Sequence, residues 1–136
     1  MGEIKAEMKI TKEDKKLIKM AKSLVNKRKV SGGIVGEVGS ALKTKRGKIF
    51  TGVSLDLYCG IGFCAEHSAI SNMISHSDDT DINTIVAFGE KEVMYPCGRC
   101  REMMELINKR NWNNTDVIIS ENKKVKLKKL LPGKWL

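Results

Sequence analysis

Two short segments of the sequence carry side chains that could bind a metal ion and use it. They are Cys64-Ala65-Glu66 and Pro96-Cys97-Gly98-Arg99-Cys100, each at the start of a predicted helix. Helix N-termini carry partial positive charge, which lowers thiol pKa values and stabilises thiolates. Three thiolates with one open position are typical of a catalytic zinc site. A free carboxylate such as Glu66 beside a metal-activated water is the arrangement for metal-assisted hydrolysis.

Two other readings of the cysteines stay open at this point. Cys97 and Cys100 alone could be a redox pair or half of a structural zinc site. With Cys59 and Cys64 they could also form a closed site of four thiolates, although that site would leave Glu66 without a role. Cys59 is otherwise expected to be a small apolar residue of a loop or a pocket wall.

The elements that must position these residues follow from hydrophobic periodicity and turn residues. Apolar residues at helical spacing predict three helices, at about 12–29, 64–75 and 97–110. Runs rich in β-branched and apolar residues predict five strands, at about 34–42, 48–56, 84–89, 116–120 and 123–127. The glycines inside the first strand suggest that another part of the backbone approaches it closely. This order of elements indicates a three-layer α/β domain with a mostly buried sheet.

Length and charge restrict the classes of protein that fit. The 136 residues suit a single domain over 1–136, and the 41% of hydrophobic residues suffices for one core. The net charge of +9 lies mainly in lysine-rich segments at the two ends, with few aromatic residues for stacking on bases. We therefore do not expect a nucleic-acid partner. The stretch from Met1 to Lys16 is charged and no apolar run is long enough for a membrane span, so a cytoplasmic protein without a membrane partner is expected.

The two cysteine segments together resemble the motifs of the zinc-dependent cytidine deaminases, including the blasticidin S deaminases. The first motif is Cys-Ala-Glu, and the second is Pro-Cys-Gly-x-Cys-Arg about thirty residues later. Val38–Leu42, Gly47–Val53 and Leu130–Pro132 are also similar to segments of that family. Cysteine as the first ligand resembles the small enzymes that act on free nucleosides. The resemblance implies a three-layer α-β-α fold with a mixed, roughly five-stranded sheet, and a homotetramer.

The same resemblance implies a role for each site residue. Cys64, Cys97 and Cys100 would bind Zn²⁺, and Glu66 would move protons between the activated water, ring N3 and the departing ammonia. Arg99 and His67 would offset the negative charge of the three thiolates. The substrate would be contacted by the remaining candidates: Ser40, Ser54, Asp56, Trp135 and the backbone N–H of Ala65. Ser54 and Asp56 stand where the family usually has Asn and Glu, so the pocket could accept a substrate other than plain cytidine.

The sequence therefore predicts a hydrolase that deaminates a free aminopyrimidine nucleoside, with cytidine or deoxycytidine as the preferred substrate. A blasticidin-like or other aminated heterocycle is the main alternative substrate. A zinc-stabilised basic module that binds RNA without catalysis is a more distant alternative, and an RNA-editing deaminase is disfavoured by the short loops.

Overall fold

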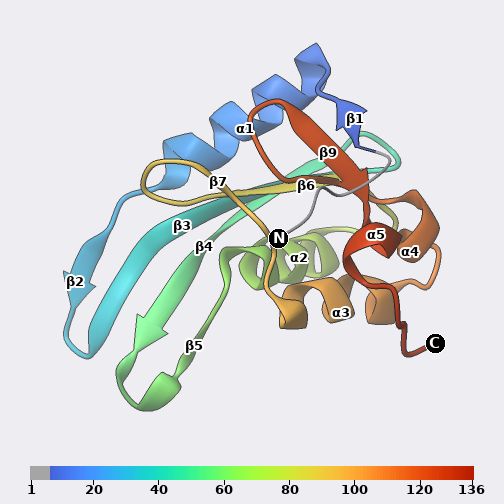
Figure 1. Cartoon of the computed structure of the whole chain (residues 1–136). Coiled ribbons are helices and arrows are strands. Elements are labelled where there is room, and N and C mark those ends of the chain that lie inside the picture. Colours follow the sequence, from blue (N-terminus) through green and yellow to red (C-terminus); the bar gives the residue numbers. More distant parts are fainter. Residues whose placement is uncertain (1–6) are drawn as a thin grey trace.

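The computed structural model describes residues 7–136 as one mixed β-sheet with helices on both faces (Figure 1). The five predicted strands are all present and are consecutive neighbours in the order β9-β8-β6-β3-β4. Short strands extend the sheet, and β6 pairs in parallel with β8 whereas the other recorded pairs are antiparallel. The strands are β1 Met8–Lys9, β2 Arg28–Val30, β3 Gly33–Thr44, β4 Ile49–Leu57, β5 Gly62–Phe63, β6 Ile82–Phe88, β7 Val93–Met94, β8 Asp116–Ile118 and β9 Lys123–Lys126.

The helices make two layers, one on each side of the sheet. Helix α1 covers one face, and α2 and α3 lie under the other (Figure 1). The bounds are α1 Lys12–Leu24, α2 Ala65–His76, α3 Gly98–Ile107, α4 Asn111–Asn114 and α5 Leu127–Leu130, with a 3-10 turn at Tyr58–Gly60. The predicted three-layer fold is therefore confirmed. Among the described residues, no helix has the length and apolar character needed to cross a membrane.

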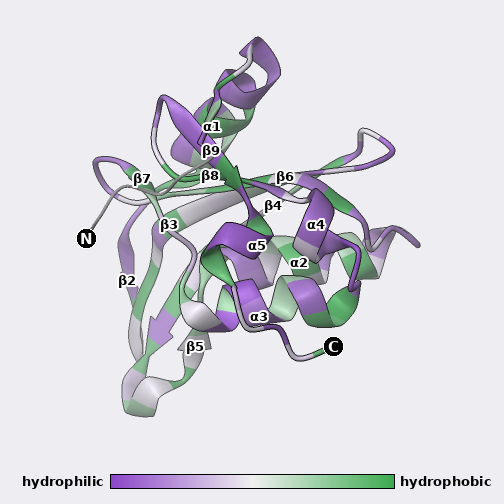
Figure 2. Cartoon of the chain, turned by 45° about the vertical axis from the view of Figure 1, so that its right-hand side comes forward, coloured by the Kyte–Doolittle hydropathy of each residue, from purple (hydrophilic) through white to green (hydrophobic). Residues whose placement is uncertain are grey.

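Side chains of the central strands alternate between the two faces of the sheet, so each face has its own hydrophobic core. Ala41 and Val86 pack with α1, whereas their neighbours Leu42 and Ile85 belong to the core under α2 and α3. Successive strand residues face opposite sides of a sheet, so β3 and β6 are buried on both faces. In Figure 2, β6 is coloured mainly as hydrophobic, as expected for a strand covered on both sides.

Helix α2 lies so close to the sheet that one strand position must be glycine. A Cβ added at Gly52 of β4 would overlap the amide nitrogen of Ala69 and the side chain of Ser68. A Cβ at Gly39 of β3 would likewise overlap the carbonyl oxygen of Ala21 in α1. The close approach expected at the glycines of the first predicted strand is confirmed at Gly39. The approach at Gly52 was not predicted, and it holds α2, which carries Glu66, against β4.

Two predicted helices are longer than the helices that form. Helix α1 begins after Thr11, whose side chain and that of Asp14 make a reciprocal capping box, but it ends at Leu24 rather than near residue 29. The following residues instead pair with β3, from Arg28 opposite Val35 to Val30 opposite Gly33. Helix α3 ends at Ile107 because Asn108 adopts extended geometry. In both cases the periodic spacing of apolar residues continues beyond the helix. The backbone nevertheless leaves the helical conformation, to pair with β3 after α1 and at the extended Asn108 after α3.

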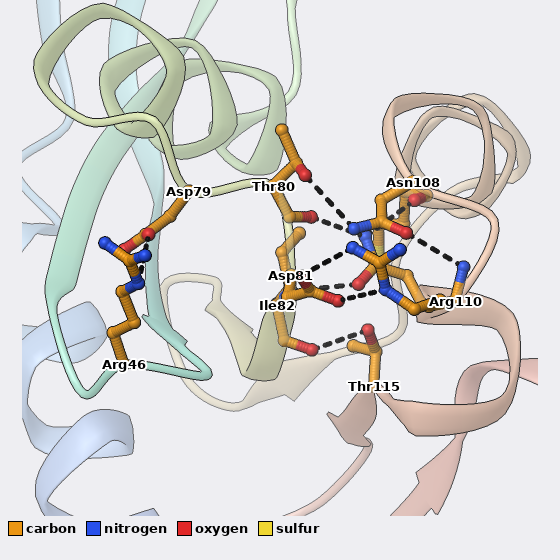
Figure 3. Close-up of polar contacts among 10 residues, drawn as sticks. Arg46, Asp79, Thr80, Asp81, Ile82, Asn108, Arg110 and Thr115 are labelled. Carbon is orange, nitrogen blue, oxygen red and sulfur yellow. Dashed lines mark hydrogen bonds and ion pairs between the residues drawn. The ribbon is translucent and has the colours of Figure 1, made fainter.

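Polar contacts tie the loop before β6 to the segment after α3 (Figure 3). The fully buried Asn111 accepts a hydrogen bond from the Ile82 amide and donates to the carbonyls of Thr80 and Met104. Arg110 donates twice to Asp81, each time at 3.0 Å. These contacts fix α3 relative to the sheet. Residues 1–6, where the charged stretch from Met1 to Lys16 begins, lie outside the described part of the chain.

Candidate active site

Three cysteine side chains converge between the N-termini of α2 and α3. The sulfur atoms of Cys64 and Cys97 are 3.4 Å apart, and those of Cys97 and Cys100 are 3.5 Å apart. All three sulfurs lie within 4.8 Å of one another. Cys59 is exposed and is not a member of this group, so the closed site of four thiolates does not form.

The local backbone explains why these sulfurs meet. Cys64 and Cys97 are the residues that precede α2 and α3, and both have extended geometry. Their carbonyl oxygens accept the first helical hydrogen bonds, from the amides of His67 and Arg101 respectively, at 3.1 Å each. Cys100 follows in the first turn of α3 and is fully buried. Two helix N-termini, each with a partial positive charge, therefore meet at the sulfurs.

The surroundings shift the thiol pKa values in different directions. Burial raises the pKa of Cys64 and of Cys100, and neighbouring thiols and Glu66 add to the increase at Cys100. Burial also opposes ionisation of Cys97, but hydrogen bonds from the backbone of Cys100 and Arg99 and from the other thiols outweigh it, so its pKa is lowered. The neighbouring pair of Cys64 and Cys97, rather than the fully buried Cys100, therefore contains the thiol that ionises first.

The donor set fits a zinc ion. Zn–S bonds of about 2.3 Å in tetrahedral geometry place two sulfurs about 3.8 Å apart, which is close to the 3.4 Å and 3.5 Å separations here. The three free thiols, of which Cys100 is buried, Cys64 half-buried and Cys97 exposed, form a soft ligand set, which favours zinc over magnesium or calcium. Three protein ligands also leave a fourth position open, as in catalytic rather than structural zinc sites.

Glu66 lies beside the cysteines without belonging to their group. Its side chain is in the first turn of α2, is 4% exposed and lines the same cavity as Cys64 and Cys97. Burial raises the pKa of Glu66. A carboxyl group with a raised pKa can both accept and deliver a proton near neutral pH.

The cavity has a volume of about 410 Å³ and opens between the N-terminus of α2 and strands β3 to β5. Three of the residues predicted to contact substrate line it, namely Ser54, Asp56 and Ala65. It also contains residues that sequence reasoning missed, namely Glu37, Val38, Phe63, Met94 and Tyr95. The glycines around residue 37 were a signal of irregular backbone, but no sequence pattern showed which side chain the irregularity would turn inward.

Two predicted substrate contacts lie elsewhere. Ser40 is fully buried in β3, and its hydroxyl donates to the carbonyl of Val86 at 2.8 Å, so it does not line the cavity. Trp135 is 79% exposed and is also absent from the cavity wall. The tail that carries it lies along α3, where the amide of Leu136 donates to Glu105.

Arg99 and His67 share a second hollow next to the cysteine group, together with Phe63 and Met103. Burial and the positive charge of Arg99 lower the pKa of His67. The His67 Nε2 atom is buried without a hydrogen-bond partner in the described part of the chain. Arg99 is exposed, and within residues 7–136 no hydrogen bond links its guanidinium to a cysteine sulfur.

The sequence is similar to a protein-family model and to curated proteins. The family model described as the cytidine and deoxycytidylate deaminase zinc-binding region matches residues 11–114. Blasticidin-S deaminase of Bacillus cereus is 36% identical over 77 residues, covering 49% of this chain and 54% of that protein. A probable cytidine deaminase of Dictyostelium discoideum is 37% identical over 67 residues, covering 48% of this chain and 46% of that protein. The chain therefore matches about half the length of these curated relatives.

Solved structures share the fold. The cytidine deaminase of Mycobacterium leprae superposes with a TM-score of 0.73 at 22% identity, covering 90% of this chain and 99% of that one. The cytidine deaminase of Burkholderia pseudomallei gives 0.72 at 24% identity, covering 93% and 100%. The matched family region contains all three clustered cysteines and Glu66. On this evidence the chain belongs to the family of the cytidine and deoxycytidylate deaminase zinc-binding region.

Proposed function

We propose that the protein is a zinc-dependent hydrolytic deaminase of a free aminopyrimidine nucleoside, converting cytidine or deoxycytidine to the uracil nucleoside and ammonia. The observation that carries the proposal is the shared cavity of Glu66, Cys64 and Cys97. It joins a buried proton carrier to two of the three thiols that fit zinc, in a space of about 410 Å³ that can hold a small molecule.

Each residue has a defined task in this reaction. Cys64, Cys97 and Cys100 hold the metal, which when bound lowers the pKa of water and so supplies a nucleophile. Glu66 accepts a proton from the attacking water and delivers it to ring N3 as the water oxygen bonds to C4 of the pyrimidine. It then moves the remaining hydroxyl proton to the amino group, which leaves as ammonia when the C4–N bond breaks. The backbone N–H of Ala65, at the N-terminus of α2, holds the carbonyl oxygen of the pyrimidine.

In this proposal Arg99 rather than His67 offsets the charge of the metal site, because burial and Arg99 lower the pKa of His67 and so disfavour its charged form. Three thiolates leave the zinc site with a net charge of about −1, which a nearby guanidinium would partly offset. The effect of Arg99 on the pKa of His67 supports an electrostatic role at this position. Replacement of Arg99 by Ala should therefore lower zinc affinity and turnover, and unchanged values would remove the role.

Two polar residues of the cavity wall support a nucleoside substrate. Ser54 and Asp56 offer a hydroxyl and a carboxylate to the sugar hydroxyls. One curated relative is named a blasticidin-S deaminase and the other a probable cytidine deaminase. A blasticidin-like nucleoside is therefore the alternative substrate.

We infer a homotetramer with sites at the subunit boundaries. Two apolar residues that line the cavity are exposed in the single chain, Ile61 at 65% and Phe63 at 39%, as is Tyr58 at 70% in the 3-10 turn just before them. Trp135, also exposed, would contact ligand only if a second copy brought it to the cavity. Light scattering of the purified protein tests the assembly, and a monomer at micromolar concentration would refute it.

Ammonia release by zinc-loaded protein tests the function. The panel contains cytidine, deoxycytidine, cytosine, CMP, blasticidin S and adenosine, and Glu66→Gln is the control because it keeps the side-chain shape but cannot carry the proton. Turnover of one compound, lost in the control, is expected. Silence across the panel with zinc still bound would refute the proposal, and salt-dependent RNA binding in the same preparation would favour the binding module.

A further inference from the structure

The second hollow beside the cysteine group is lined by one face of each of two helices. From α2 and α3 respectively come His67, Ser68 and Ser71, and Arg99 and Met103. Residues three or four apart lie on the same face of a helix, so the two helices present these side chains to one space. The hollow has a volume of about 370 Å³, which is enough for a small molecule.

Four polar groups of the second hollow have no partner within residues 7–136. The guanidinium of Arg99 makes no hydrogen bond or ion pair there, and the hydroxyls of Ser68 and Ser71 make no hydrogen bond. The Nε2 atom of His67 is buried and also lacks a partner. Guanidinium, hydroxyl and imidazole groups can all donate hydrogen bonds. Because buried polar atoms in proteins nearly always have partners, these groups together point to a ligand that accepts hydrogen bonds.

The charge of the second hollow favours a negatively charged ligand. The described residues of its wall include Arg99 and no aspartate or glutamate. After burial, the positive charge of Arg99 is the next cause that lowers the pKa of His67, so this charge is felt across the hollow. The first turn of α2, which carries positive partial charge, lies along the same wall.

We propose that the second hollow binds a small oxyanion of the phosphate type between Arg99 and the hydroxyls of Ser68 and Ser71, and that this binding lowers the affinity of the cysteine site for zinc. Phosphate oxygens accept several hydrogen bonds at once, two of them in parallel from one guanidinium. A bound oxyanion neutralises Arg99, whose charge otherwise offsets the three thiolates. The effect on zinc rests on the zinc site of the proposed function, whereas the anion site rests on the donors of the hollow alone.

Calorimetry of zinc-loaded protein with inorganic phosphate tests the site, at an ionic strength held constant with chloride. We expect saturable binding of one phosphate per chain. Ser71 is exposed on α2, so Ser71→Glu places a carboxylate in the hollow without disturbing the core. This carboxylate pairs with Arg99 and repels the anion, so the dissociation constant for phosphate should rise by about tenfold. No saturable binding, or equal binding by Ser71→Glu and native protein, would overturn the proposal.

Ser75→Glu is the matched control, because Ser75 lies one turn further along α2, is exposed and does not line the hollow. It adds the same charge to the same helix and should leave phosphate binding unchanged. An equal loss of binding in both variants would assign the binding to the general field of the basic chain, and the proposed site would fail.

Competition with a chromogenic chelator tests the coupling to zinc. Saturating phosphate should lower the zinc affinity of native protein by about tenfold, since the charge of Arg99 no longer acts on the thiolates. Ser71→Glu should show the lower affinity without phosphate and no further change with it. The Ser75→Glu protein, measured in parallel, corrects for binding of phosphate to free zinc. Unchanged zinc affinity of native protein in saturating phosphate would overturn the coupling.

Kinetics of ammonia release separate this site from the substrate cavity and from failure of the deaminase function. Phosphate in the second hollow should lower kcat for cytidine without raising KM, whereas phosphate in the substrate cavity would compete with cytidine. Purely competitive inhibition that persists in Ser71→Glu would therefore overturn the proposal. If no nucleoside is deaminated but phosphate binds and weakens zinc through the hollow, the anion site stands and the deaminase function fails. If ammonia is released and no phosphate binds, only the anion site fails.

Discussion

The guanidinium of Arg101 donates a hydrogen bond from Nε to the carbonyl oxygen of Pro96, at 2.8 Å, immediately before the metal-site residue Cys97. Its Nη1 donates at 3.1 Å to the carbonyl of Leu130 at the end of α5. One side chain thus joins the loop that presents Cys97 to the C-terminal segment. Contacts of this kind orient metal ligands without touching the metal.

Replacement of Arg101 by Met should therefore weaken zinc binding. The variant keeps an extended apolar stem but loses both donors, so Pro96 and Cys97 become less well fixed. We expect zinc affinity to fall by about 10–100-fold, as measured by competition with a chromogenic chelator. Arg46→Met is the control, because Arg46 is an exposed arginine whose recorded contact is an ion pair with Asp79 (Figure 3). Equal affinities for the Arg101 variant and the native protein would show that Arg101 does not position the ligand.

Zinc removal should change which thiols react. In zinc-loaded protein, only the exposed Cys59 should react rapidly with a thiol reagent, because the other three sulfurs are engaged by the metal. After chelation, Cys64 and Cys97 should become reactive, with Cys100 slower because its side chain is fully buried. Mass spectrometry of the labelled peptides measures the order. Rapid labelling of all four thiols before chelation would contradict the three-cysteine site.

Replacement of Gly52 by Ala should destabilise the fold and move α2. The new methyl group would overlap the Ala69 amide nitrogen, so α2 must shift away from β4. Such overpacking costs about 1–3 kcal/mol in the free energy of unfolding, which urea denaturation measures. Gly133→Ala is the matched control, because nothing lies within 4 Å of a Cβ at that position. A Gly52 variant as stable as the control would show that the close helix approach is not required.

Asp14 should make stability depend on acid pH. Burial by itself would raise the pKa of Asp14, but hydrogen bonds from Lys124 and Thr11 outweigh it and hold the pKa below its ordinary value. A group with a lowered folded-state pKa stabilises the fold above its unfolded pKa of about 3.9. That contribution is lost as the pH falls through the lower folded-state pKa.

The test of this pH dependence is urea denaturation of native protein and Asp14→Asn between neutral and acid pH. At neutral pH the variant should lose about 1–3 kcal/mol in the free energy of unfolding, because Lys124 and the Thr11 amide lose a charged partner. The two proteins should converge as the pH falls. Parallel curves down to the lowest pH would show that Asp14 is not the titrating group.

Local sequence patterns predicted the framework of the protein because the framework depends on local physics. Alternation and apolar runs located β3, β4, β6, β8 and β9, since strands buried on one or both faces must carry those residues. Thr11 marked the start of α1, because a side-chain oxygen there satisfies a free helix amide. The short strands β1, β2, β5 and β7 were missed, because two or three residues contain too little pattern to separate a strand from a loop.

The candidate site was likewise predictable only in part from the sequence. The types and spacing of Cys64, Glu66, Cys97 and Cys100 determined the metal chemistry, because only certain donors bind zinc and each pair lies within one helix start. The packing of β4, α2 and α3 decided three further points: that the two helix starts meet, that Glu66 is buried and that Cys59 takes no part. This packing involves contacts between residues far apart in the sequence, which local patterns do not reveal. The same packing placed Ser40 against Val86 instead of in the cavity and turned Glu37 inward through a bulge. Only the tertiary structure could decide those positions, because a side chain's surroundings are set by strand register and helix approach rather than by its neighbours along the chain.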